Sequence, residues 1–194
     1  MPAPSGSHSP TLDRRGDFER IALPVAPTLY RTAHRLSRRP EDASDVVQET
    51  FLRAYRTFAN FREGTNAKAW LFTILYSIVA NRWRAERRAP DEVAVDDIES
   101  RFGMALASKQ VDAEQALLSR LDASPEVDHA LRDLPDAQRA AVLLVDVEEL
   151  TYEETARVLD CPLGTVRSRL ARGRKQLFVA LTEYARRTGA LRDR

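Results

Sequence analysis

The chain has 194 residues, of which 43% are hydrophobic and 30% are charged, and its formal net charge at pH 7 is +1. This length allows one domain or two small ones, and the hydrophobic content is sufficient for real cores. The single cysteine excludes an internal disulfide and a multi-cysteine zinc site.

Glycine is scarce and no run of alternating β-branched residues occurs, so we expect an all-α fold. Residues 1–16 are rich in Pro, Ser and Gly and are predicted to form a disordered N-terminal tail. This tail has no apolar signal-peptide segment, and no stretch of the chain approaches 18 apolar residues. We therefore expect a cytoplasmic protein.

The first predicted helix runs from about Phe18 to Ser37, is interrupted near Pro24 and Pro27, and ends at Pro40. Residues 40–60 then form an amphipathic helix with a predicted apolar stripe of Val47, Phe51, Ala54 and Phe58. Its other face carries Asp45, Gln48, Glu49 and Arg53. The pattern fits an ordinary solvated face and a docking surface equally well.

Residues 67–88 form a second informative helix, which is apolar at first and basic towards its end. Trp70 and Trp83 are expected to pack in the core rather than to stack on bases. Ser77 and Asn81 lie at the apolar-to-basic junction, where they could form hydrogen bonds to bases. The basic end consists of Arg82, Arg84, Arg87 and Arg88.

Residues 89–124 contain eight acidic and three basic side chains and only weak apolar periodicity, apart from a short predicted helix around 113–121. We interpret this segment as a flexible acidic linker between two small helical domains. An acidic tether would compete with DNA for its basic neighbours, so the segment is also a candidate to run through a nucleic-acid channel.

The second domain begins at Ser124-Pro125, with one helix to about Leu134 and another from Pro135 to about Val147. Thr151 and Glu154 then form a capping-box pattern that predicts a helix start at Tyr152.

A tight turn at residues 160–162 leads into a last helix, which ends near Arg187 before a short tail, 188–194. Its buried side is predicted to be Val166, Leu170, Leu177 and Leu181. Its other faces carry Arg167, Arg169, Arg172, Arg174 and Lys175. This arrangement predicts a helix-turn-helix whose second helix enters the major groove, and the alternative is a surface hairpin with solvated arginines.

No catalytic, metal or cofactor site is predicted. Cys161 lies in the turn and is interpreted as a small buried apolar residue. His8, His34 and His129 have no ligand-like spacing, and the chain has neither a nucleophile–base pair nor a phosphate-binding glycine loop.

Three stretches together resemble the extracytoplasmic-function (ECF) sigma factors, a group of sigma-70-type bacterial initiation factors. DVVQETFLRAYRTF resembles conserved region 2.2, AKAWLFTILYSIVANRWRAERR resembles regions 2.3 and 2.4, and YEETARVLDCPLGTVRSRLARGRKQL resembles region 4.2. The resemblance implies a non-enzymatic factor with region 2 at 17–88, a linker at 89–124 and region 4 at 125–187.

The resemblance also implies roles and partners. It implies binding to the β′ coiled coil of core RNA polymerase through Asp45, Gln48 and Glu49. It implies contacts with the promoter −10 element through Ser77, Asn81, Arg82, Arg84, Arg87 and Arg88. It implies contacts with the −35 element through Thr165, Arg167, Ser168, Arg169 and Arg172. Many relatives have Asn in place of Ser77. The family further implies a linker threaded towards the RNA exit path and an anti-sigma factor as an inhibitory partner.

Arg167 and Arg172 are five residues apart, about 140° round a helix, so one can reach a base edge while the other braces the backbone. The sequence leaves the assignment open, but Arg167 lies nearer the helix N-terminus and is the expected base reader. The competing function is a stand-alone helix-turn-helix regulator, which would usually need a dimer interface or a ligand pocket.

Overall fold

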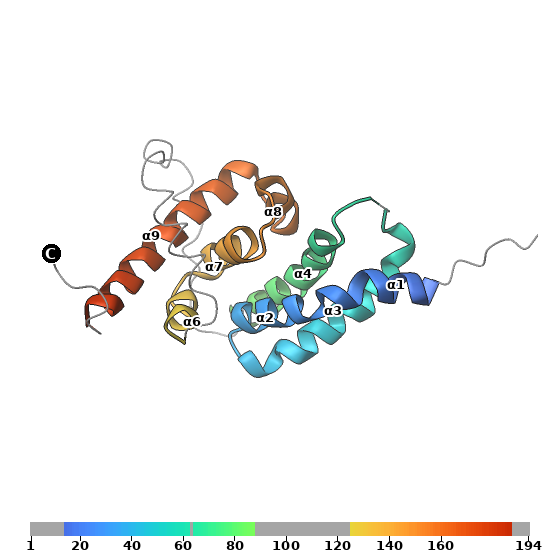
Figure 1. Ribbon diagram of the computed structural model, residues 1–194, viewed down its shortest axis with the longest axis horizontal. Coiled ribbons are helices and arrows are strands. Elements are labelled where there is room, and N and C mark those ends of the chain that lie inside the picture. The colour runs from blue at the N-terminus through green and yellow to red at the C-terminus, as the bar shows by residue number, and fades with distance from the viewer. Residues whose placement is uncertain (1–13, 63, 88–124, 188–194) are drawn as a thin grey trace, which may run out of the picture.

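The computed structural model describes residues 14–62, 64–87 and 125–187, and every regular element in these ranges is helical, as predicted (Figure 1). The N-terminal tail to residue 13, Arg88, the acidic linker with its predicted short helix, and the tail 188–194 lie outside the described residues.

The helices fall into two groups. The first group contains α1 (Arg14–Ala22), η1 (Leu23–Val25), α2 (Ala26–Leu36), η2 (Pro40–Asp42), α3 (Ala43–Thr57), η3 (Phe58–Asn60) and α4 (Ala67–Arg87). The second contains α6 (Pro125–Arg132), α7 (Asp136–Val142), a π-helical turn η4 (Leu143–Val147), α8 (Tyr152–Val158) and α9 (Leu163–Arg187).

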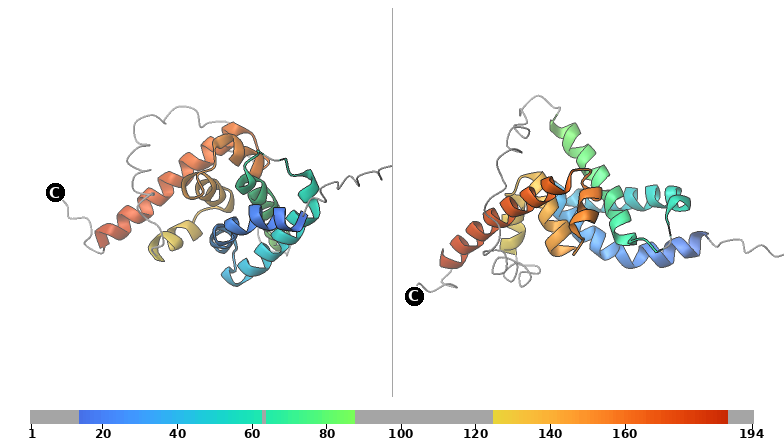
Figure 2. Two further views of the ribbon diagram at one scale, coloured as in Figure 1. Left: turned by 45° about the vertical axis from the view of Figure 1, so that its right-hand side comes forward. Right: turned by 90° about the horizontal axis from the view of Figure 1, so that it is seen from above.

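The first group packs α2 and α3 against α4, and Figure 2 shows the three helices side by side from two further directions. The core contains Leu29 and Leu36 from α2 and Leu71, Phe72 and Leu75 from α4, all fully buried. The predicted breaks at Pro24 and Pro40 are confirmed, because each proline lies at the start of a short 3₁₀ turn between helices.

The buried side of α3 is rotated round the helix, relative to the predicted apolar stripe, by about one residue position. Val46, Thr50 and Ala54 are fully buried, whereas Val47, Phe51 and Phe58 are only half-buried. The predicted stripe missed Thr50, which is tolerated in the core because its hydroxyl donates a hydrogen bond of 2.7 Å to the Val46 carbonyl.

The disordered tail was predicted to reach residue 16. This boundary is wrong, because residues 14–16 form the first turn of α1. The Arg14 guanidinium donates hydrogen bonds to the carbonyls of Tyr55 (2.9 Å) and Arg56 (3.2 Å) at the end of α3. Phe18 then packs edge-on against Tyr55, with ring centroids 5.2 Å apart. These contacts attach α1 to α3 and order the start of the helix.

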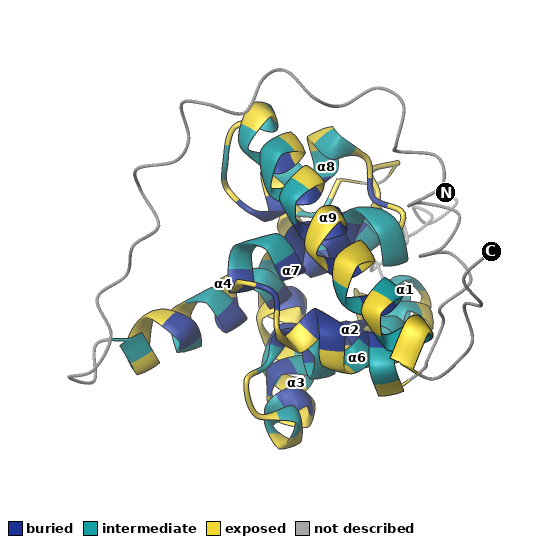
Figure 3. Cartoon of the chain, turned by 90° about the vertical axis from the view of Figure 1, so that its left-hand side faces the viewer, coloured by how far each residue is buried: buried dark blue, intermediate teal, exposed yellow. Residues whose placement is uncertain are grey.

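The second group is a helix-turn-helix supported by α6 and α7. The capping box is confirmed: the Glu154 amide donates to the Thr151 hydroxyl, and the Glu154 carboxylate accepts from the Thr151 amide. The predicted buried side of α9 is also confirmed, since Val166, Leu170 and Leu177 are almost fully buried and Leu181 nearly so. Figure 3 shows this alternation of buried and exposed residues along the helices.

The helix predicted to run regularly to Val147 instead widens into the π-helical turn η4. The Glu148 amide bonds the Leu143 carbonyl at 2.9 Å, and the Leu150 amide bonds the Leu144 carbonyl at 2.9 Å. Such turns are rare and insert an extra residue into a helical turn. Residues 146 and 148 both come from the end of this wide turn: Asp146 contacts α9, and Glu148 contacts the first group of helices.

Arg174 does not belong to an exposed basic face, contrary to the prediction. It is buried, and its Nε donates to Asp146 Oδ2 at 3.0 Å while its Nη2 bonds the other carboxylate oxygen. Burial lowers the pKa of Arg174, but the hydrogen bond and charge of Asp146 outweigh it and the pKa is raised overall. The bidentate pair therefore fastens the middle of α9 to η4.

Gly173 permits the close packing of α9 on α7. A Cβ at this position would lie 2.8 Å from Cγ2 of Val142 and 3.4 Å from the Gln138 carbonyl oxygen. We expect Gly173→Ala to lower the free energy of unfolding by about 1–3 kcal/mol through overpacking. Denaturant unfolding measures this change in the free energy of unfolding. Gly164→Ala is the matched control because nothing lies within 4 Å of its Cβ position, so it should be neutral or stabilising. Equal effects of the two substitutions would contradict the packing argument.

Removal of the Arg174 guanidinium should leave the buried Asp146 carboxylate without its cation. We expect Arg174→Ala to lower the free energy of unfolding by about 3 kcal/mol, as for other broken buried pairs. The exposed neighbour Lys175 is the control, and Lys175→Ala should change stability by less than about 0.5 kcal/mol. A stable Arg174→Ala protein would show that the pair is not a structural anchor.

Candidate nucleic-acid interface

One side of α4 is exposed and polar. At about 100° per residue, Ser77, Asn81 and Arg84 lie within a narrow sector of the helix, and all three are exposed. The Arg84 Nη2 donates to the Asn81 side-chain oxygen at 2.7 Å, and the Ser77 hydroxyl donates to the Ile74 carbonyl at 2.7 Å. We call these three residues the open stripe of α4. It presents hydroxyl, amide and guanidinium groups, which suit hydrogen bonding to bases and phosphates.

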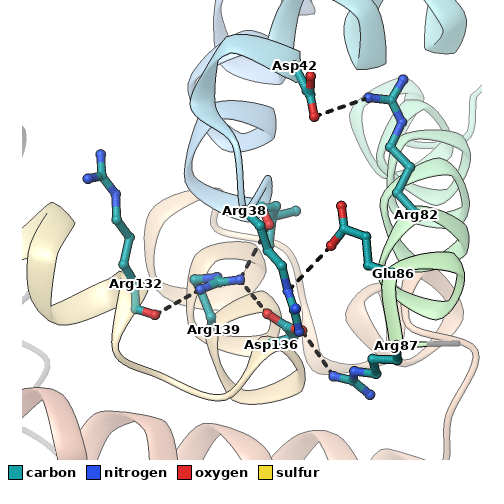
Figure 4. Close-up of polar contacts among 9 residues, drawn as sticks. Arg38, Asp42, Arg82, Glu86, Arg87, Arg132, Asp136 and Arg139 are labelled. Carbon is teal, nitrogen blue, oxygen red and sulfur yellow. Dashed lines mark hydrogen bonds and ion pairs between the residues drawn. The ribbon is translucent and has the colours of Figure 1, made fainter. Parts of the chain in front are cut away.

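The other basic residues predicted for the −10 element do not join this stripe. Arg82 points to η2 and α3, with its guanidinium nitrogens 4.0 Å from Asp42 Oδ2 and 3.7 Å from Glu49 Oε2. Arg87 points to the second helical group and lies 3.0 Å from Asp136 Oδ2 (Figure 4). Arg88 lies outside the described residues.

Trp83 and Trp70 pack inside the molecule, as expected. Trp83 is 6% exposed and contacts Tyr76 edge-on, with ring centroids 5.9 Å apart. Trp70 is half-buried and lies 4.9 Å from the Phe61 ring centroid. The buried Trp83 indole is not available as a platform on which bases could stack, and Trp70 packs on an aromatic neighbour.

The polar face of α3 is exposed at Asp45 and Gln48 and half-exposed at Glu49. Glu49 accepts from Arg53, one turn further on, and also pairs with Arg82. Leu52 continues the same side of the helix and is 59% exposed. The α3 face therefore combines carboxylate, amide and apolar groups on one surface.

The outward side of α9 carries most of the residues predicted for the −35 element. Thr165, Ser168 and Arg172 share a sector of the helix opposite the buried residues, and Arg169 and Arg167 lie on its two flanks. The Ser168 hydroxyl donates to the Thr165 carbonyl at 3.0 Å. Arg167 is exposed and the other four are half-buried.

The turn before α9 has the expected tight geometry. Asp160 has a φ of 48°, in the left-handed region that Asp tolerates better than most residues. Cys161 is half-buried rather than buried, and this partial burial raises the pKa of its thiol although Arg169 opposes the shift.

Helix α4 lies beside the helix-turn-helix. Helix α8 packs against α4, and the Asn66 side-chain amide at the start of α4 donates to Glu154 Oε1 at 2.8 Å. Burial raises the pKa of Tyr76 on α4, although the charge of Arg169 on α9 opposes this shift. The side of α4 next to the open stripe is thus covered by the helix-turn-helix.

The described residues contain no group of three His, Cys, Asp or Glu side chains that could hold a metal ion. Among their helices, none combines the length and apolar character that crossing a membrane requires.

Comparison with known proteins identifies both helical groups. A family model described as "Sigma-70 region 2" matches residues 23–89, and one described as "Sigma-70, region 4" matches residues 124–177. The "ECF RNA polymerase sigma factor SigE" of Mycolicibacterium smegmatis is 36% identical over 172 residues, which are 88% of this chain and 64% of that relative. The "ECF RNA polymerase sigma-E factor" of Salmonella typhimurium is 34% identical over 167 residues, or 84% of this chain and 87% of the relative.

A solved structure shares the arrangement as well as the sequence. The sigma factor RpoE of Bartonella quintana, crystallised with the anti-sigma factor NepR, aligns with a TM-score of 0.66 and 30% identity, and the alignment covers 86% of this chain and 97% of that one. The chain belongs to the ECF sigma factors, the group within the sigma-70 family that directs RNA polymerase to promoters.

Proposed function

We propose that the chain docks on core RNA polymerase through the α3 face and reads two promoter elements, the −10 element with α4 and the −35 element with α9. The observation that carries this proposal is the presence of two polar, donor-rich helix faces on two separate helical groups. Residues 17–88 act as region 2, residues 89–124 as the linker and residues 125–187 as region 4. The protein works in the cytoplasm with the polymerase and catalyses no reaction itself.

The docking role rests on the composition of the α3 face. Asp45 and Gln48 are exposed, and Leu52 adds an apolar contact one turn further along. A partner helix with basic and apolar residues, such as one strand of a coiled coil, would complement this combination. Glu49 contributes less directly, because Arg53 and Arg82 already share its carboxylate.

The −10 role rests on the open stripe of α4. Extrusion of a base costs a few kcal/mol, which a helix with three exposed polar residues cannot supply alone. The polymerase supplies the remaining contacts, and Ser77 and Asn81 hydrogen-bond the exposed bases. Arg84 and, in the promoter complex, Arg82, Arg87 and Arg88 contact the DNA backbone.

The −35 role rests on the outward side of α9. Arg172 lies about 160° round the helix from the buried Leu170, whereas Arg167 lies only about 60° from it. A helix in the major groove turns its outward side to the bases and its flanks to the phosphates. We therefore assign base reading to Ser168 and Arg172 and backbone contact to Thr165, Arg167 and Arg169, which reverses the expectation from the sequence for Arg167.

An anti-sigma factor is a proposed inhibitory partner. The solved RpoE structure contains such a partner, NepR, and this chain aligns with 97% of that RpoE chain. An inhibitor that covers the α3 face or the outward side of α9 would block polymerase or promoter binding.

The docking proposal is tested with Asp45→Lys combined with Gln48→Ala. We expect this variant to bind core polymerase at least about tenfold more weakly, because a cation replaces an anion at the contact. Glu153→Lys, an exposed charge reversal on α8, is the control and should bind core normally. Quantitative co-purification with core measures both. Equal binding by the double variant and the wild type would exclude the α3 face as the docking site.

The −35 assignment is tested with Arg172→Ala and Arg167→Ala in holoenzyme, against all single-base −35 variants at two salt concentrations. Arg172→Ala should lose about 1–3 kcal/mol of discrimination at one position. Arg167→Ala should weaken all promoters alike and reduce the salt slope by about one phosphate contact. Arg186→Ala, near the far end of α9, is the control. The opposite pattern would return base reading to Arg167.

A further inference from the structure

The inward side of α9 is held by a polar contact that lies directly behind the residues assigned to base reading. Arg172 and Arg174 are two residues apart, or about 200° round the helix. Arg172 therefore belongs to the outward side, whereas Arg174 is buried against η4. We call Arg174 and its partner Asp146 the α9 anchor.

The α9 anchor is a buried and directional ion pair. The Arg174 and Asp146 side chains are only 6% and 3% exposed. Arg174 Nε donates to Oδ2 of Asp146 at 3.0 Å and Nη2 donates to Oδ1, so both carboxylate oxygens are engaged. Two parallel hydrogen bonds fix the relative orientation of the two planar groups, which a single contact does not. The anchor therefore resists rotation of α9 about its own axis.

The anchor also reaches the first helix of the helix-turn-helix. Burial lowers the pKa of Arg174, but the hydrogen bond and charge of Asp146, together with a hydrogen bond to the Tyr152 side chain, raise it overall. Tyr152 is the first residue of α8, and Asp146 belongs to η4. Arg174 is thus tied to both of the helical elements that precede α9 in the chain.

The backbone around the anchor is as specific as the side chains. Gly173, next to Arg174, lets α9 approach α7 so closely that a Cβ would lie 2.8 Å from Cγ2 of Val142. Asp146 lies within the π-helical turn η4. A π turn takes one more residue than an α turn, which shifts the residues after it by about 100° round the helix. The wide turn therefore determines where the Asp146 carboxylate meets α9.

Stability alone does not account for a charged pair at this place. Apolar residues of similar volume often stabilise a protein as well as a buried ion pair or better, because burying two charges costs desolvation energy. Apolar contacts lack direction, however, and allow a helix to turn or slide at little cost. A bidentate pair supplies the direction that they lack.

We propose that the α9 anchor is a positioning element for sequence reading, which holds α9 at the rotation where Arg172 and Ser168 face the bases. This inference rests on the −35 role proposed above for α9. A base contact needs placement within about 0.5 Å, whereas attraction to phosphates acts over about 10 Å and tolerates small displacements. Loss of the anchor therefore reduces discrimination between bases and leaves affinity for DNA of any sequence nearly unchanged.

Arg174→Lys tests this separation in holoenzyme, because lysine keeps the charge but cannot form the bidentate pair. The probes are a promoter selected with the wild-type holoenzyme from a randomised library, its single-base −35 variants and an unrelated duplex. The ratio of affinities for the selected and the mismatched −35 sequences should fall at least about threefold, out of the roughly 5- to 150-fold that one bidentate base contact provides. Affinity for the unrelated duplex and its salt dependence should stay as in the wild type.

Val127→Ala is the matched control for a general loss of stability. It removes buried methyl groups from α6, a helix that contacts the far end of α9 through a hydrogen bond of 2.8 Å from Tyr184 to Glu126. Its affinity ratio should equal that of the wild type. An unchanged ratio in Arg174→Lys, or an equal fall in Val127→Ala, would overturn the proposal.

An apolar exchange separates positioning from stability. Arg174→Met combined with Asp146→Leu removes both charges, and exchanges of this kind commonly preserve folding. The double variant should unfold at a denaturant concentration close to that of the wild type and still show the reduced affinity ratio. A folded double variant with the wild-type ratio would contradict the inference. If the exchange does not fold, the comparison of Arg174→Lys with Val127→Ala decides.

Distances between spin labels test the anchor without DNA. The labels are attached at Glu153→Cys on α8 and Lys175→Cys on α9, in a full chain that carries Cys161→Ala. The distance distribution should be narrow with the anchor intact and clearly broader with Arg174→Lys, and equal distributions would overturn the inference. A wild-type holoenzyme without any −35 base preference would instead refute the proposed function of α9, while a broadened distribution would still support the anchor.

Discussion

The arrangement of the two helical groups depends on the burial of α4, whose apolar side chains must be covered on more than one side. Its apolar residues surround most of the helix, and a helix of this kind must be buried on several faces. Leu71 and Leu75 pack within the first helical group, and Tyr76 and Trp83 face the second. The open stripe of Ser77, Asn81 and Arg84 is part of the surface that remains exposed. The covering of α4 thus decides both which of its polar residues are exposed and where the second group packs.

Within the second group, α9 is fixed in place by its own packing contacts. Gly173 and the pair of Arg174 with Asp146 hold the middle of the helix against α7 and η4, so that its outward side projects from a rigid support. The wide turn η4 supplies Asp146 for this anchor and leads directly to Glu148, which contacts the first group. One irregular turn therefore positions α9 and also leads to a contact between the two groups.

Much of this arrangement could be predicted from local sequence. Spacing identified the helices, the capping box at Thr151 and the buried side of α9, because these depend on neighbours within a few residues. Arg174 could have been found the same way: it lies four residues after Leu170 and three before Leu177, on the buried side. The π-helical turn has no comparable signal. Pairing of Glu148 with Thr32 joins residues 116 apart, and only the folded chain brings them together.

The central claim is that this chain reads two separated DNA elements only as a subunit of RNA polymerase. The most direct measurement is selection of bound sequences from a randomised DNA library, with the purified chain alone and with the chain assembled on core polymerase. The account predicts enrichment only with core, as two short sequence blocks at a fixed spacing. Enrichment by the chain alone, above all of a palindromic site, would contradict it and indicate a stand-alone helix-turn-helix regulator.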